Sequence, residues 1–217
     1  MTFNEWLKIG MDNKWCGPAV CETHDGLPIS EAELDEFAES DPCIHILRLY
    51  EDADHAKAIE ELSLYASSSN YEINIRLAYL NYVNVKYQQS AILYKKCIES
   101  APKSIEARLG YVYSLAALEK WEDVLTQYKE ILKIDPGNAK ALYFISMMYF
   151  NRADFNTAQT YLSTYLSLYP FDFDGVNLAG WTKYNLGKKE EAISLFKKAL
   201  LLNPSSTLYD TVLVNKK

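Results

Sequence analysis

Four prolines recur at one fixed step in the last two thirds of this chain of 217 residues. The same 34-residue step separates each of them from the next, and other columns of apolar residues keep it too. Such self-similarity is typical of repeat proteins, in which each unit packs only against its neighbours. The columns are Pro102, Pro136, Pro170 and Pro204; Tyr94, Tyr128, Leu162 and Phe196; and Ile98, Leu132, Leu166 and Leu200.

Each repeat is predicted to be a pair of helices. Stretches such as ALYFISMMYF and EEAISLFKKALLL carry apolar residues at helical spacing. The proline that follows each pair has no amide hydrogen and ends the second helix, and Asn138 is placed to cap the next one. One pair alone cannot bury its apolar face, so four pairs must stack. The predicted helices span 72–84, 88–100, 104–117, 121–134, 138–151, 155–168, 173–185 and 189–202.

The last copy of the repeat carries a set of residues typical of a known family. Gly180, Ala192, Phe196, Ala199 and Pro204 stand where the tetratricopeptide repeat pattern expects them, and residues 71–204 as a whole resemble that family. The earlier copies depart from it, because bulkier residues replace several of the small ones. The resemblance implies a mainly α fold, a right-handed α-solenoid of four helix-turn-helix repeats. It also implies a scaffold for protein–protein or peptide interaction, which binds on the concave face lined by the first helix of each pair.

The register of the repeats predicts which residues line this groove. The predicted groove is aromatic and apolar, so we expect a ligand with an apolar or aromatic anchor, to which tyrosine hydroxyls donate or from which they accept hydrogen bonds. The alternative for each of these side chains is packing between adjacent repeats, which is the prediction for Tyr82, Phe150 and Tyr184. The candidate groove residues are Tyr79, Leu109, Tyr113, Tyr143, Met147, Asn177 and Trp181.

The segment 1–70 differs from the repeats in charge. It holds 15 acidic and 4 basic side chains, a net charge of −11, whereas the segment 71–217 has a net charge of +4. We predict a small acidic α/β module over 1–55, a helix and linker over 56–70, and a partial capping helix and tail over 205–217. WCGPAVCETHDGLP and DPCIHILRLY within the first module resemble a family of small uncharacterised phage and bacterial proteins, which implies no function.

The N-terminal module also gathers residues that could bind a metal ion. Zinc takes four thiolate or imidazole ligands, and two short clusters of such residues flank a predicted helix here. A zinc-binding N-terminal domain with its own activity, for which the repeats recruit a substrate, is therefore an alternative function; ordinary packing of these side chains is the other possibility. The candidate ligands are Cys16, Cys21, His24, Cys43 and His45.

The remaining observations exclude classes of function. No phosphate loop, dinucleotide glycines or metal-hydrolase helix motif occurs, so we predict no catalytic residues, no enzyme activity and no cofactor for the repeats. The acidic first module and the absence of a basic stripe argue against nucleic acid as a partner. No apolar run is long enough to cross a membrane, and the acidic start does not resemble a signal peptide. We therefore expect a cytoplasmic protein with a protein or peptide partner, with self-association left open.

Overall fold

The computed structural model describes residues 55–64 and 71–205, and all regular structure in these two ranges is helical. The chain divides into two compact units between Ser67 and Ser68. The described part of the first unit is helix α4 (His55–Ser63), in which Ala58, Ile59 and Leu62 are buried. The predicted α/β module at 1–55 and the predicted tail after residue 205 lie outside the described residues, apart from His55 at the start of α4.

The second unit is a row of helices that agree with the predicted ones to within one residue at each end. Their spacing follows the 34-residue step of the sequence, with a short turn inside each pair and a proline-containing loop between pairs. The helices are α5 (Tyr71–Val83), α6 (Tyr87–Ser100), α7 (Ile105–Ala117), α8 (Trp121–Ile134), α9 (Ala139–Asn151), α10 (Phe155–Leu168), α11 (Phe173–Asn185) and α12 (Lys189–Leu202).

The first helices of the second, third and fourth pairs begin with equivalent caps. The side chains of Ser104, Asn138 and Asp172 each accept a hydrogen bond from the backbone amide three residues later, at 3.1, 3.1 and 2.7 Å. Each cap satisfies an amide that has no partner inside the helix. The capping role predicted for Asn138 is confirmed, and polar caps of different chemistry begin the neighbouring pairs.

The turn inside each pair requires a left-handed backbone at one position. Val85, Glu119, Ala153 and Gly187 follow the 34-residue step and have φ angles of 63°, 58°, 59° and 76°. Only glycine adopts this conformation without a steric cost from Cβ. The fourth repeat therefore has the unstrained residue, whereas the first places a β-branched side chain there.

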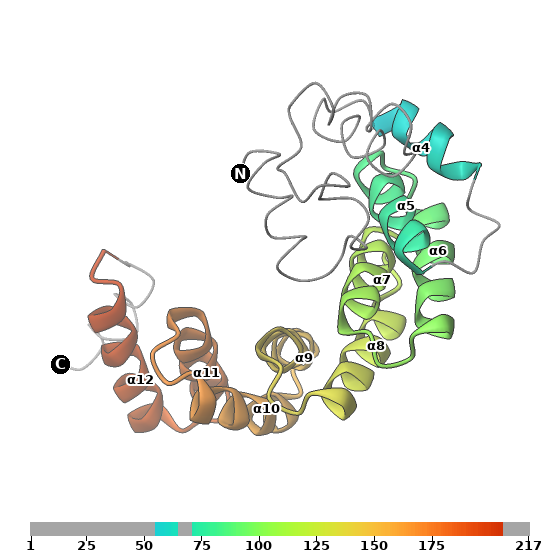
Figure 1. The fold of residues 1–217 in the computed structure, drawn as a ribbon. Helices are drawn as coiled ribbons and strands as arrows, with labels where there is room; N and C mark the ends of the chain where they lie inside the picture. The colour runs from blue at the N-terminus through green and yellow to red at the C-terminus, as the bar shows by residue number, and fades with distance from the viewer. Residues whose placement is uncertain (1–54, 65–70, 206–217) are drawn as a thin grey trace, which may run out of the picture. The chain divides into compact units, whose positions relative to one another are not determined.

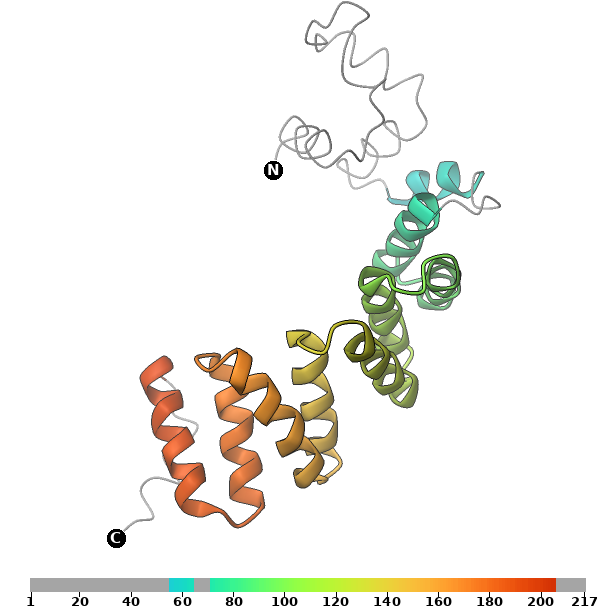
Figure 2. The ribbon, with the colours of Figure 1, turned by 60° about the horizontal axis from the view of Figure 1, so that its bottom comes forward.

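The helices stack in chain order, each against the next (Figure 1). In addition, α5 contacts α7 and α9 contacts α11, so first helices of neighbouring pairs meet across the repeats. Figure 2 shows α9 to α12 side by side, with alternating direction. Within this unit the first helices of the pairs lie along the inner side of the curve, and α6, α8 and α10 lie along its outer side.

The repeating columns supply the core of this unit. Ser90, Val124, Ala158 and Ala192 are all buried at the same place in the four second helices. One turn further along, Phe196 is fully buried in the fourth repeat and Tyr94, Tyr128 and Leu162 are buried in the others. Cys97 is fully buried, and desolvation raises the pKa of its thiol to about 11, so it is a packing residue.

Candidate functional site on the inner face

We call the surface formed by the exposed sides of α5, α7, α9 and α11 the inner face (Figure 1). At 3.6 residues per turn, residues four apart in one helix point in similar directions, so each first helix contributes a short row of side chains. Interactions between these helices make the rows continuous from one repeat to the next. The inner face comprises Tyr79, Tyr82, Leu109, Tyr113, Tyr143, Met147, Phe150, Asn177, Trp181 and Tyr184.

On the first helices of the first two repeats, the most exposed aromatic side chains are Tyr79 and Tyr113, which are 43% and 37% exposed. Tyr82 lies next to them and is half-buried; its ring centroid is 6.3 Å from that of Tyr113 and 5.5 Å from that of Tyr87. The partial burial fixes one side of each ring while the other side stays open to solvent. These tyrosines are therefore suited to receive an apolar group and a hydrogen bond at once.

A lysine of the third repeat completes this aromatic surface. The Lys140 ammonium donates a hydrogen bond to the Tyr113 hydroxyl at 2.7 Å and lies 5.4 Å from the centre of the same ring. Lys140 is exposed. The contact joins α7 to α9 and places a positive charge beside the aromatic side chains, where a carboxylate of a ligand would be stabilised.

The third repeat contributes side chains that are more enclosed. Tyr143 and Met147 are half-buried, as is Leu109 in the preceding repeat, which packs against the core formed by α7, α8 and α9. The Tyr143 ring contacts those of Phe144 and Tyr165 at centroid distances of 5.7 and 5.8 Å. Burial, with the nearby charges of Asp174 and Asp172, raises the pKa of the Tyr143 hydroxyl, which stays protonated.

In the fourth repeat, Tyr184 is more exposed than Trp181. Tyr184, predicted to pack mainly between repeats, is 40% exposed, so that prediction is wrong. Trp181 is half-buried and packs on Phe196, with ring centroids 5.0 Å apart, while its other neighbour is Tyr184 at 5.8 Å. The two-ring contact anchors Trp181 to the core of this repeat. Asn177 lies one turn earlier and is half-buried.

The structure thus brings the seven predicted groove residues onto one face of successive first helices, at different depths. Lys140 is not among the predicted groove residues, because its contact with Tyr113 lies across two repeats. Tyr82 and Phe150, predicted to pack between repeats, are half-buried.

The proposed metal ligands cannot be placed in the same way. Cys16, Cys21, His24, Cys43 and His45 all lie outside the described residues, so the zinc site stays a prediction. Among the residues that the structure describes, no group of three or more His, Cys, Asp or Glu side chains could hold a metal ion. No helix in those same ranges is long and apolar enough to span a membrane.

Comparison with known proteins decides which kind of repeat this is. The family model described as tetratricopeptide repeat matches residues 175–206, which hold most of α11, all of α12 and the loop that follows. Residues 175–206 match the tetratricopeptide repeat, and the three earlier helix pairs have the same fold. The three earlier copies repeat the left-handed turn and the core columns of the matched copy at the same 34-residue step, and the second and third copies also repeat its cap.

Solved structures show the same tetratricopeptide-repeat fold. MamA from Desulfovibrio magneticus RS-1 is 15% identical with a TM-score of 0.65, over 78% of this chain and 97% of that one. A double mutant of MamA RS-1 is 16% identical with a TM-score of 0.67, over 79% and 97%. YrrB, described as a TPR protein with an unusual peptide-binding site, is 15% identical with a TM-score of 0.65, over 84% and 97%. No curated protein sequence matches the chain. The resemblance of residues 1–55 to phage proteins stays a prediction.

Proposed function

We propose that this protein is a non-enzymatic scaffold that binds a protein or peptide on the inner face of its tetratricopeptide repeats. The observation that carries the proposal is the set of tyrosines along α5 and α7, two of them substantially exposed, with Lys140 held beside Tyr113. The peptide-binding site named for YrrB, which has the same fold, supports a ligand of this kind.

The chemistry of the face defines the ligand. Aromatic rings with one open side favour an apolar or aromatic anchor, since burying such a group removes apolar surface from water. Lys140 adds a preference for an acidic group near that anchor, because it donates its hydrogen bond to a neutral hydroxyl and can turn to a carboxylate. We therefore expect a peptide with an aromatic or aliphatic residue close to an aspartate, a glutamate or a carboxyl end.

Selection of peptides from a random library against the full-length protein tests this function. Peptides recovered in the selection should lose about tenfold in affinity for Tyr113→Ala and several-fold for Tyr79→Ala, because a few anchor contacts dominate binding energy. These two residues are better probes than Trp181, whose removal would also disturb the core around Phe196. Trp121→Ala on α8, where the side chain is 53% exposed, is the matched control and should leave affinity unchanged. Equal affinity for all three variants would contradict the proposed function.

A further inference from the structure

A pocket lies between the second helices of the last two repeats. Its volume is about 370 Å³, within the range of ligand-binding pockets in proteins. We call it the α10–α12 pocket. It is lined from α10 by Gln159, Leu162, Ser163 and Leu166, from α11 by Ala179, Thr182 and Lys183, and from α12 by Glu191, Ser194 and Leu195.

This pocket is separate from the inner face. At about 100° per residue, Asn177 and Trp181 point to one side of α11, whereas Ala179, Thr182 and Lys183 point to the opposite side. A ligand in the α10–α12 pocket would therefore not compete directly with a peptide on the inner face.

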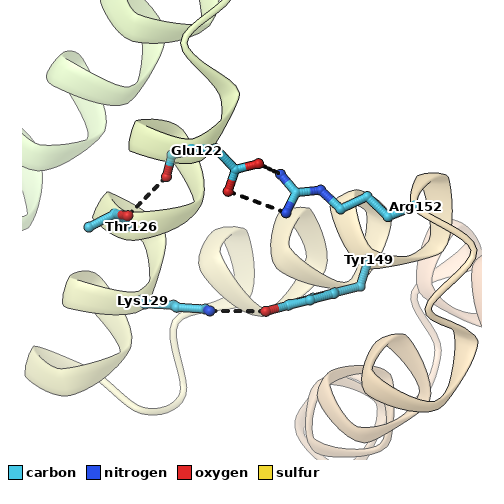
Figure 3. Close-up of polar contacts among 5 residues, drawn as sticks. All are labelled: Glu122, Thr126, Lys129, Tyr149 and Arg152. Carbon is cyan, nitrogen blue, oxygen red and sulfur yellow. Dashed lines mark hydrogen bonds and ion pairs between the residues drawn. The ribbon is translucent and has the colours of Figure 1, made fainter.

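The sequence opens the pocket by placing small side chains where the preceding repeat has large ones. Ala179 and Thr182 are the counterparts, one repeat later, of Ile145 and Met148. In the preceding junction, between α8 and α10, the ring of Tyr149 stacks on that of Tyr161, with centroids 6.0 Å apart and planes 8° apart. The Tyr149 hydroxyl also accepts a hydrogen bond from Lys129 at 2.9 Å (Figure 3). The counterparts of these two tyrosines in the next junction are Lys183 and Leu195.

The pocket combines an apolar floor with an excess of positive charge at its mouth. Leu162, Leu166 and Ala179 supply apolar wall. The Lys183 ammonium donates to the Glu191 carboxylate at 2.6 Å; the side chain of Lys183 is 19% exposed and that of Glu191 is 56% exposed. Lys188 reaches the rim and donates to Gln159 at 3.4 Å.

The two lysines thus surround one carboxylate, which leaves a net positive charge at the mouth. In agreement, hydrogen bonding to Lys183 and the charges of Lys183 and Lys188 lower the pKa of the Glu191 carboxyl. Glu191 lies on the solvent side of the ion pair and can swing outward, whereas Lys183 is held against the pocket by the packing of its stem. An incoming carboxylate could replace Glu191 as the partner of Lys183.

We propose that the α10–α12 pocket is a second binding site, which takes an apolar group that carries a carboxylate. The apolar group fills the space between Leu162, Leu166 and Leu195, and its carboxylate pairs with Lys183. A free aliphatic acid and the carboxyl end of a peptide with an apolar last residue share this chemistry.

Titration of the full-length protein with defined probes tests the site and separates the two sources. The probes are octanoate, a blocked tripeptide ending in leucine as the free acid, and the amide of each. Methyl NMR resonances of Leu162, Leu166 and Leu195 report occupancy. At least one acid should shift them, and its amide should bind about tenfold more weakly, since a charge-assisted hydrogen bond is lost. The acid that binds more tightly identifies the source.

Substitutions of Lys183 and Glu191 should change the affinity for the acid in opposite directions. Lys183→Met keeps most of the stem and should weaken binding about tenfold, whereas Glu191→Gln releases Lys183 and should strengthen it about threefold. Lys183→Arg keeps the charge and should retain binding, which guards against a folding defect in the methionine variant. Lys197→Met, at an exposed position of α12 outside the pocket lining, is the control and should bind like the wild type. The site is overturned if neither acid moves the methyl resonances, if acid and amide bind alike, or if Lys183→Met binds like the wild type.

Discussion

The junction between the first and second repeats and the junction between the second and third use the same register with different chemistry. In the first, the Tyr94 ring fills a space left by Gly110, where a Cβ would lie within 2.2 Å of the ring. In the second, Tyr128 and Phe144 occupy the equivalent positions and stack, with centroids 5.5 Å apart and planes 7° apart. One residue of the incoming first helix therefore decides whether the preceding ring inserts or stacks.

The polar contacts of the two junctions also differ, because those of the first junction are buried and those of the second lie nearer the surface. Ser90, Ser114 and the backbone carbonyl of Ala78 form buried hydrogen bonds of 2.7 and 2.8 Å in the first junction. The second junction is joined at its surface, by Arg152 with Glu122 at 2.7 Å and by Lys129 with Tyr149 (Figure 3). Exposed ion pairs contribute little to stability, so the second junction depends more on its stacked rings. We expect the first junction to be the less tolerant of substitution.

Gly110→Ala is expected to have the largest effect. The new methyl group would overlap the Tyr94 ring, and because both sit in a packed interface the free energy of unfolding should fall by about 3 kcal/mol. Chemical denaturation followed by circular dichroism measures the change. Gly137→Ala is the control: its Cβ would meet the nearest atom, of Leu168, at an ordinary 3.5 Å, and its stability should stay near that of the wild type. Equal losses in the two variants would mean that Tyr94 does not insert.

Ser90→Ala should have an intermediate effect. The hydroxyl is fully buried and bonds to both Ala78 and Ser114, so its loss should lower the free energy of unfolding by about 1.5 kcal/mol. The cost is limited because Ser114 can still donate to the carbonyl of Gly110. Denaturation of Ser90→Ala beside the surface variant Ser100→Ala measures it. A variant as stable as the wild type would show that apolar packing alone holds the first junction.

The stacked pair of the second junction can be measured by a double-mutant cycle. Tyr128→Leu and Phe144→Leu keep apolar bulk but remove the ring-to-ring contact, so the coupling energy between the two positions should be about 1 kcal/mol. The same cycle on Tyr128 with Leu109 tests whether the coupling is particular to the stack. Additive effects at Tyr128 and Phe144 would contradict the claim that the second junction depends on its stacked rings.

Arg152→Ala should have the smallest effect. The Arg152 side chain is 37% exposed and Glu122 is 80% exposed, so solvent and salt screen the pair. We expect a loss below about 0.5 kcal/mol that disappears in 1 M salt. Denaturation at two salt concentrations measures it. A loss as large as that of Ser90→Ala would mean that the surface contacts carry the second junction.

The fold could be predicted from the sequence because its main determinants are periodic. Proline, the capping residue and the buried columns each return once in every repeat, so one register fixes every helix boundary over 71–202. The packing of residues that differ between the repeats could not be predicted. Gly110 and Phe144 share a column but pack in different ways, and a list of residue types does not reveal the depth to which a ring inserts.

The candidate site could likewise be predicted only in part. The register placed Tyr79 and Tyr113 on the inner face, because the direction of a side chain follows from its position in the helix. It could not give the anchoring of Trp181 to Phe196, the exposure of Tyr184 or the contact of Lys140 with Tyr113, which depend on how neighbouring helices approach. The α10–α12 pocket depends on small residues in three helices and leaves no motif in the sequence.

Site-specific photocrosslinking tests the central claim most directly. The full-length protein carries benzoylphenylalanine at position 113, on the inner face, or at position 121, on α8, and is exposed to a peptide recovered in the selection. If the first helices hold the partner, position 113 forms the crosslinked product and position 121 does not. A product at position 121 with none at position 113 would contradict the assignment of the inner face as the binding surface.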